Sequence, residues 1–197
     1  MRSPTLIAAA AILLAACSPA KAPAKGDSPA TPGASQPAGP AEPTGFAHPA
    51  GASLFGYYMP SADTKVGTWQ LNNFAIGDEE AFKDWEGGKH SPTYAPVMLE
   101  FDDMSSPMGT NELGAEYHTG SERILPTAYA ITPDGKIDFV GKGAKLGKVT
   151  FHGQLDMAAL QAATREDAAG NAVVLHGTLT VGDKRFENMA FTYFAGD

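Results

Sequence analysis

Alternating apolar and polar residues along most of the chain predict β-strands. The alternation is clearest in seven segments, each of which places its apolar side chains on one face. These segments are 66–76, 96–101, 124–131, 136–140, 148–155, 173–181 and 185–194. The sequences Pro133-Asp134-Gly135 and Gly182-Asp183 between them are typical of tight turns. The alternation of the last segment slips at Glu187-Asn188, which predicts a β-bulge there.

Two short helices are expected between these strands. Asp78 is placed to cap a helix over 79–85, and Asp156 to cap a second helix over 157–165. Many strands separated by turns, with so little helix, favour antiparallel pairing. We therefore expect a mainly β domain, an antiparallel β-sandwich or barrel of about six to eight strands with one or two short helices.

The first sixteen residues have the composition of a secretory signal peptide. One basic residue, Arg2, precedes an apolar run over 6–16, and no acidic side chain is present. The run is well short of the ~20 residues that a transmembrane helix needs. Residues 1–16 are therefore predicted to direct export rather than to remain in the membrane as a span.

The apolar run ends in Leu14-Ala15-Ala16-Cys17, which resembles the lipobox of bacterial lipoproteins. The resemblance is confined to this N-terminal segment and implies cleavage before Cys17, which would then carry diacylglycerol and an N-linked acyl chain such as palmitate. Several acyl chains anchor a protein in the lipid bilayer persistently, whereas a single chain binds reversibly. The alternative is a stray or buried cysteine that happens to follow a signal peptide.

The residue after the cysteine bears on localisation. By the same resemblance, an aspartate there implies retention at the inner membrane, but this chain has Ser18. We therefore expect a protein of the cell envelope, anchored by lipid to the outer membrane and facing the periplasm. The inner membrane and the cell surface are the alternatives.

Residues 17–50 are predicted to be the lipidated cysteine followed by a disordered tether. Eight of the 15 prolines lie between 18 and 50, and alanine, glycine and serine make up most of the remainder. A segment made of proline and such small residues buries too little apolar surface to form a core. Residues 51–197 then form a single domain with 11 basic and 20 acidic side chains, a net charge of −9. Such an acidic domain argues against nucleic acid as a partner.

Two of the predicted strands contain a similar motif centred on a His-Gly pair. Residues 149–155 read VTFHGQL and residues 173–179 read VVLHGTL. In both, strand alternation turns the histidine away from the apolar face. If the strands are neighbours, His152 and His176 share one face, where they could bind a metal or line a ligand groove. The alternative is two solvated histidines on strands with similar hairpin requirements.

A second group of candidate ligands consists of Met98, Met104, Met108 and His118. Thioether and imidazole groups suit copper in an oxidising compartment. Methionines close to the end of a strand also fill cores and loops, which is the alternative interpretation. Exposed aromatic side chains, if the fold leaves any, would mark a binding face.

Motifs of the common enzyme classes are absent from the sequence. There is no Gly-x-Ser-x-Gly elbow, no His-Glu-x-x-His and no phosphate-binding glycine loop, and Cys17 is the only cysteine. We predict no catalytic residue and no cofactor. The leading hypothesis is a non-enzymatic lipoprotein whose domain binds an envelope protein or glycan. The alternatives are a small-ligand carrier, using a barrel cavity for lipid or the His152 and His176 pair for a metal, and a hydrolase with dispersed catalytic residues.

Replacement of Cys17 by alanine tests the lipid anchor. The variant lacks the thiol that would be acylated, so we expect it to differ from the wild type in size and to leave the outer-membrane fraction. Globomycin, which blocks lipoprotein signal cleavage, should raise the mass of the wild type and leave the mass of Cys17→Ala unchanged. Immunoblots of membrane fractions measure both effects. Unchanged size and fractionation under both treatments would contradict the anchor.

Overall fold

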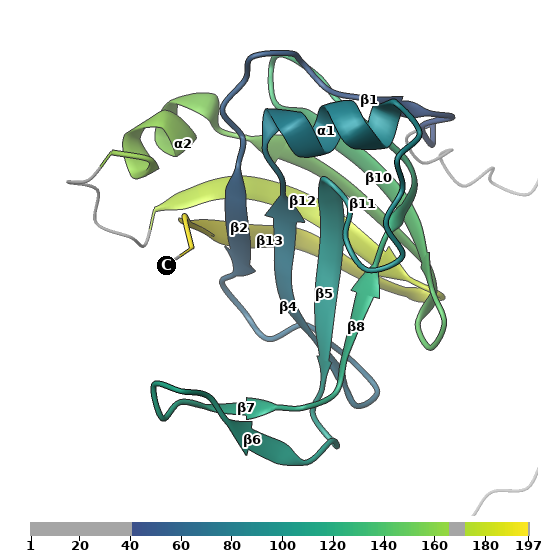
Figure 1. Ribbon diagram of the computed structural model, residues 1–197, viewed down its shortest axis with the longest axis vertical. Coiled ribbons are helices and arrows are strands. Elements are labelled where there is room, and N and C mark those ends of the chain that lie inside the picture. Colours follow the sequence, from purple (N-terminus) through teal and green to yellow (C-terminus); the bar gives the residue numbers. More distant parts are fainter. Residues whose placement is uncertain (1–40, 166–171, 197) are drawn as a thin grey trace, which may run out of the picture. The chain divides into compact units, whose positions relative to one another are not determined.

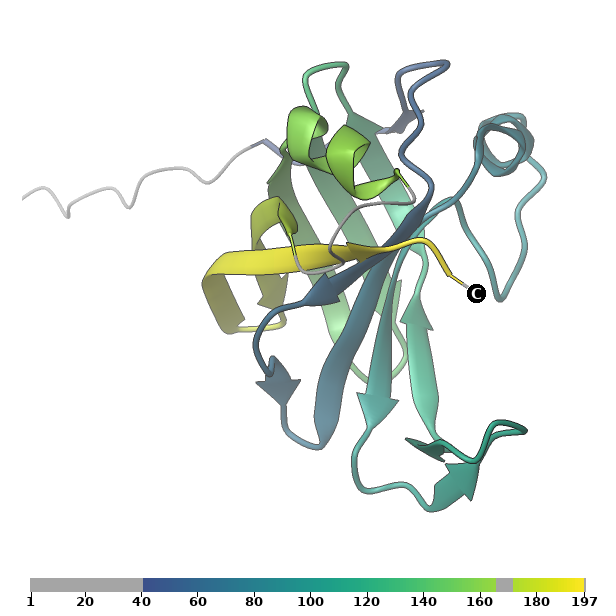
Figure 2. The same ribbon diagram turned by 90° about the vertical axis from the view of Figure 1, so that its left-hand side faces the viewer.

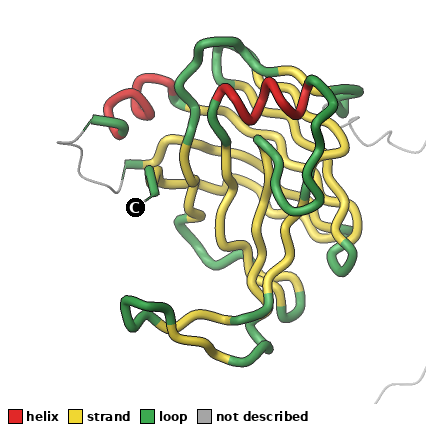
Figure 3. Tube along the Cα trace, viewed as in Figure 1, coloured by secondary structure: helices red, strands yellow, loops and turns green. Residues whose placement is uncertain are grey.

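The computed structural model describes residues 41–165 and 172–196. The predicted signal peptide, Cys17 and the tether up to residue 40 lie outside these residues. Strands dominate the described chain, and two short helices accompany them (Figure 3). Neither helix has the length and apolar character needed to cross a membrane.

Among the described residues, eleven strands form one sheet and two form a separate hairpin. The strands are β1 (Phe46–Ala47), β2 (Gly56–Pro60), β3 (Lys65–Val66), β4 (Trp69–Ile76), β5 (Val97–Asp103), β6 (Met108–Thr110), β7 (Glu116–His118), β8 (Ser121–Ile124), β9 (Pro126–Ile131), β10 (Lys136–Gly143), β11 (Gly147–Leu155), β12 (Val173–Val181) and β13 (Lys184–Phe194). The order in the sheet is β1-β9-β10-β11-β12-β13-β2-β4-β5-β8, and β3 pairs with β4. Pairing is antiparallel except between β1 and β9.

The sheet curls into a half-barrel (Figures 1 and 2). β8, at one edge, and β9, near the other, follow each other in the chain with only Leu125 between them. The carboxylate of Glu122 on β8 accepts hydrogen bonds from the backbone N–H groups of Lys145 (2.9 Å) and Leu146 (3.2 Å), in the turn between β10 and β11. These contacts join β8, at one edge of the sheet, to the turn between β10 and β11.

Aromatic rings fill the inside of the half-barrel. The ring of Phe151 lies 4.9 Å from that of Phe74 and 5.6 Å from that of Phe191, and Phe74 also meets Phe139 at 6.2 Å. All four are fully buried. Rings at these separations and angles pack edge-to-face or tilted, which adds to the free energy of burying their area. The interior is therefore a packed aromatic core.

Phe151 also explains the two glycines of the His-Gly motifs. Gly153 and Gly177 lie directly opposite each other on β11 and β12, and their inner sides face the Phe151 ring. A β-carbon on Gly153 would come within 2.5 Å of this ring, and one on Gly177 would come closer still. The ring needs the space that two missing side chains leave, an arrangement in which an aromatic group covers glycines in a sheet.

The two helices are α1 (Glu79–Glu86) and α2 (Met157–Ala163). As the sequence predicts, Asp78 caps α1 by accepting from the backbone N–H of Ala81, and Asp156 caps α2. α1 lies across the upper end of β4 and β5 in Figure 1 and buries Phe82 and Trp85.

The folded domain takes in residues that the composition places in the tether. Phe46 and Ala47 pair with Tyr129 and Ala130 of β9. His48 stacks on Phe82 of α1, with ring centroids 4.0 Å apart. The first strand therefore joins the entering chain both to the sheet and to α1.

The sequence predicts the mainly β class and the antiparallel pairing correctly, but it underestimates the number of strands. The predicted strand over 66–76 is divided, because Gly67 has a left-handed backbone (φ +62°) and makes a turn between β3 and β4. The predicted strand over 124–131 changes its partner at Leu125, since β8 pairs with β5 and β9 with β10. The strands β1, β2, β6 and β7 were not predicted.

Substitution of Gly177 by alanine should lower the free energy of unfolding by about 1–3 kcal/mol, because the new methyl group meets the Phe151 ring and overpacks the core. Gly45→Ala is the matched control, since a β-carbon there meets nothing within 4 Å, and its effect should stay within about 0.5 kcal/mol. Urea denaturation followed by fluorescence measures both variants. Equal effects of the two substitutions would contradict the packing role of Gly177.

Candidate functional site

The register of three strands brings polar side chains together on the outer face of the sheet. On β11 and β12, His152 lies opposite Thr178, and Gln154 lies opposite His176. The two His-Gly strands are thus neighbours, paired antiparallel about Gly153 and Gly177. Because the glycines point inward, the residues on either side of them point outward.

β10 adds one more residue to each of these two cross-strand pairs. Asp138 lies opposite His152, and Lys136 lies opposite Gln154. The result is a patch two residues deep and three strands wide. Asp138 stands between the inward-facing Ile137 and Phe139, an alternation visible in the sequence that could have drawn attention to it.

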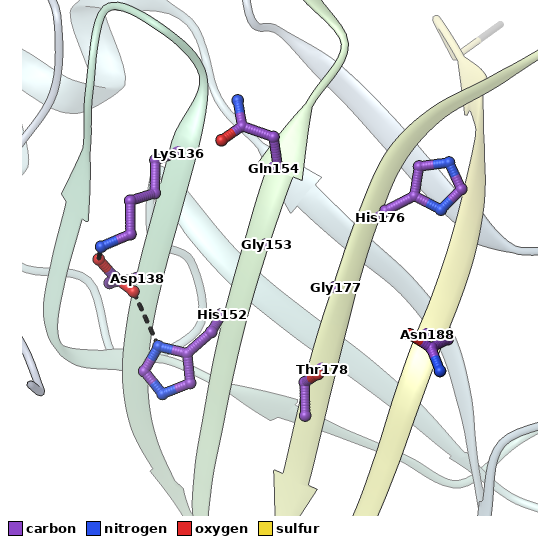
Figure 4. A pocket seen from close by; sticks show the side chains of 9 residues that line it. All are labelled: Lys136, Asp138, His152, Gly153, Gln154, His176, Gly177, Thr178 and Asn188. Atoms are coloured by element: carbon purple, nitrogen blue, oxygen red, sulfur yellow. Dashed lines mark hydrogen bonds and ion pairs between the residues drawn. The ribbon is translucent and has the colours of Figure 1, made fainter. Parts of the chain in front are cut away.

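These side chains line a shallow, open depression of about 530 Å³ (Figure 4). Its lining residues are Lys136, Asp138, His152, Gly153, Gln154, His176, Gly177, Thr178 and Asn188. Asn188 comes from β13, where the pairing with β12 shifts its register between Gly177 and Leu179. Its left-handed backbone (φ +54°) marks the irregularity, and so the bulge predicted at Glu187-Asn188 forms one wall of the depression.

Asp138 is the most buried charged group in the patch, with 8% of its surface exposed. One carboxylate oxygen lies 2.8 Å from Nδ1 of His152, and the other lies 2.8 Å from Nζ of Lys136. Burial by itself would raise the pKa of Asp138, but the hydrogen bonds from His152 and Lys136 and the nearby positive charge outweigh burial. The pKa of this carboxyl therefore lies below its ordinary value, and the group is ionised at neutral pH.

The ionised carboxylate determines the tautomer of His152. A carboxylate can only accept a hydrogen bond, so Nδ1 of His152 carries a proton and donates it. Nε2 is left as the nitrogen that can meet a ligand. An Asp-His pair of this kind also orients the base in hydrolases, but no hydrogen bond among the described residues links His152 to a hydroxyl nucleophile.

The two predicted metal ligands share a face but do not converge. In Figure 4, the His152 ring turns toward Asp138, whereas the His176 ring turns toward β13, on the other side of the two glycines. Within residues 41–165 and 172–196, no group of three or more His, Cys, Asp or Glu side chains is arranged to hold a metal. The arrangement is a row of separate hydrogen-bonding groups, and a metal at His152 and His176 stays a prediction.

The methionine group divides between two places. Met98 is buried on β5, whereas Met104 and Met108 are exposed. Met108 lies opposite His118 in the hairpin of β6 and β7. The pattern therefore places one thioether beside one imidazole.

Comparisons with known proteins add no family to this description. No protein-family model, no curated protein and no solved structure matches the chain.

Asp138→Asn tests the electrostatics of the depression. A carboxyl with a lowered pKa in the folded state stabilises the fold above the pKa that it has in the unfolded chain, ~3.9, and this contribution is lost as the pH falls through the folded-state value. We expect the variant to be less stable than the wild type by about 1 kcal/mol at pH 7. This difference should persist at pH 5 and shrink below ~4.

Denaturation in urea at pH 7, 5, 4 and 3 measures the difference. Asp183→Asn serves as the control, because Asp183 is exposed in the turn between β12 and β13. A difference for Asp138→Asn that does not change with pH would contradict a lowered pKa.

Proposed function

We propose that the protein is an outer-membrane lipoprotein, facing the periplasm, whose domain is a non-enzymatic binding module for a component of the cell envelope. The lipobox at Cys17 supports the anchor, and the proline-rich segment that follows supports a tether. The observation that carries the binding role is the outer-face depression, in which directed polar side chains stand on the rigid strands of the sheet.

A glycan is the ligand that the depression fits best. Its volume, about 530 Å³, lies in the range of small-ligand sites, which is roughly 300–1,000 Å³. Asn188 offers an amide that both donates and accepts. Gln154 offers its amide oxygen as an acceptor, because its nitrogen donates to the backbone carbonyls of Asp134 (2.6 Å) and Leu155 (3.1 Å), and Nε2 of His152 adds a further polar group. Sugar hydroxyls also donate and accept, so they can pair with such groups without a charge of their own. The open shape leaves room for a chain to continue beyond the site.

The charge of the domain is consistent with this role. A net charge of −9 on residues 51–197 repels the anionic surface of a membrane and the phosphates of nucleic acids. A tethered domain of this kind remains free to meet ligands in the periplasm. A neutral or weakly charged glycan meets no such repulsion in a depression where Asp138 is already paired with His152 and Lys136.

The two alternative functions find less support. A lipid carrier needs an empty apolar cavity, and the rings of Phe74, Phe139 and Phe151 occupy the inside of the half-barrel. A metal carrier would rest on imidazoles that point apart. A hydrolase would need a nucleophile beside Nε2 of His152, and no hydrogen bond of the described chain provides one.

Glycan binding is tested with the lipidated protein in nanodiscs, using soluble peptidoglycan fragments and the uncharged outer-core oligosaccharides of lipopolysaccharide as probes. Calorimetry should show binding of one of them to the wild type. His176→Ala and Gln154→Ala should each weaken binding about tenfold, which corresponds to ~1.4 kcal/mol.

Lys184→Ala, at an exposed position at the start of β13, should bind as the wild type does. Affinities that do not change in the His176 and Gln154 variants would place the ligand elsewhere. Failure of both probes to bind would count against a glycan ligand.

A further inference from the structure

The hairpin of β6 and β7 stands apart from the half-barrel. Figures 1 and 2 show it projecting beyond the lower ends of β5 and β8. It pairs with no strand of the main sheet. We call residues 104–120 the arm. The arm shares no residue with the outer-face depression, so it can serve a second purpose.

The arm exposes large apolar side chains. Leu113 is 89% exposed, Met108 53% and Tyr117 51%. Together with Met104, they make up half of the large exposed hydrophobic residues in the described chain. An isolated two-stranded hairpin is at best marginally stable in water, and this one gains little by burying its own side chains. Other interactions must therefore hold the conformation of the arm.

Hydrogen bonds fix the tip of the arm. The side-chain oxygen of Asn111 accepts from the backbone N–H groups of Leu113 (3.0 Å) and Ala115 (2.8 Å). Gly114 supplies the left-handed residue of the turn (φ +81°) and donates to the carbonyl of Asn111. Leu113 is thus held outward on an ordered turn.

The base of the arm is fixed in the same way. Asp103 accepts from both the backbone N–H and the hydroxyl of Ser105, at 3.0 and 2.6 Å. The hydroxyl of Ser106 accepts from the backbone N–H of Gly120 at 2.9 Å, which links the two strands where they leave the domain. The hydrogen bonds at the tip and the base restrict the conformations of the arm, so the arm loses little conformational entropy when it binds a partner.

One face of the arm carries an aromatic surface. Tyr117 lies opposite Gly109 on the neighbouring strand, and a β-carbon on Gly109 would come within 3.0 Å of the Tyr117 ring. The ring therefore lies over the glycine and presents its other face to solvent. Exposed tyrosines of this kind, held in place by their neighbours, are common anchors in protein interfaces.

The charges on the arm are all acidic. Glu112 and Glu116 flank Leu113, and residues 104–120 contain no lysine or arginine. At the base lie Asp102 and Asp103. A second copy of this acidic chain would bring like charges together, and an anionic lipid surface would do the same. The complementary partner is a protein with a basic rim.

We propose that the arm is a docking site for an envelope protein that has an apolar pocket for Leu113 and Tyr117, surrounded by lysine or arginine side chains. This inference goes beyond the glycan site, because it concerns a different surface and a different class of partner. In this proposal, the exposed apolar side chains bind the partner protein, and the acidic side chains attract it toward the tip of the arm.

Photo-crosslinking of the full chain in cells tests the proposal. A benzophenone amino acid at position 113 should yield a discrete product with one protein, whereas the same group at Lys184 should not. That protein, identified by mass spectrometry and purified, is then titrated with the lipidated chain in nanodiscs. Leu113→Ser and Glu116→Lys should each weaken its binding at least tenfold, and higher salt should weaken binding to the wild type.

Two measurements keep the result interpretable. The thermal midpoint of Leu113→Ser should match the wild type, because Leu113 is almost fully exposed. Binding of the glycan probes should also be unchanged, which separates failure of this proposal from failure of the glycan site. No specific product at position 113, a product with a second copy of this chain, or a partner whose affinity is insensitive to Leu113→Ser would each overturn the proposal.

Discussion

The contact between Phe151 and the opposed Gly153 and Gly177 links the inside of the half-barrel to its outer face. The ring is held between Phe74 and Phe191, and it fits against β11 and β12 only where neither strand has a side chain. This requirement specifies the register of the two strands, since a slip of one residue would turn every side chain to the opposite face. The arrangement of the polar side chains on the outer face of the sheet therefore depends on an aromatic packing contact inside the half-barrel.

Alternation predicted most of the large sheet because each long strand has one face in the aromatic core and the other in solvent. It failed where that rule does not apply. Gly67 ends one strand and begins another by its backbone conformation alone. At Leu125, the chain passes from β8, at one edge of the sheet, to β9, next to the other edge, without a change in pattern. The arm could not be predicted in this way, since neither of its faces meets the core.

The two histidines illustrate what a repeated motif can and cannot reveal. The motif turns both histidines away from the apolar face but does not by itself make their strands neighbours. The structure places His152 and His176 on adjacent strands and on one face, and the shared His-Gly order reflects the shared packing against Phe151. The directions of their rings depend on residues far away in the sequence. Asp138 on β10 turns His152 to one side, and His176 faces β13, where the bulge at Asn188 shapes the depression. Such side-chain orientations follow from the tertiary structure and not from spacing.

The attachment of β1 has a mechanical consequence. With the lipid anchor that we propose at Cys17, a pull on the chain reaches the domain at β1, which has only two paired residues. Its further restraints are packing and polar contacts of Phe46, His48 and Glu42. Phe46 packs against the rings of Trp85, His90 and Tyr129, and His48 stacks on Phe82 and lies 2.8 Å from Glu86. Glu42 forms an exposed ion pair with Lys148, and exposed ion pairs contribute little. Under tension, this short parallel strand would peel away before the long antiparallel strands shear. Release of β1 would then lengthen the tether by ~3.5 Å for each residue freed, while the depression and the arm keep their shape.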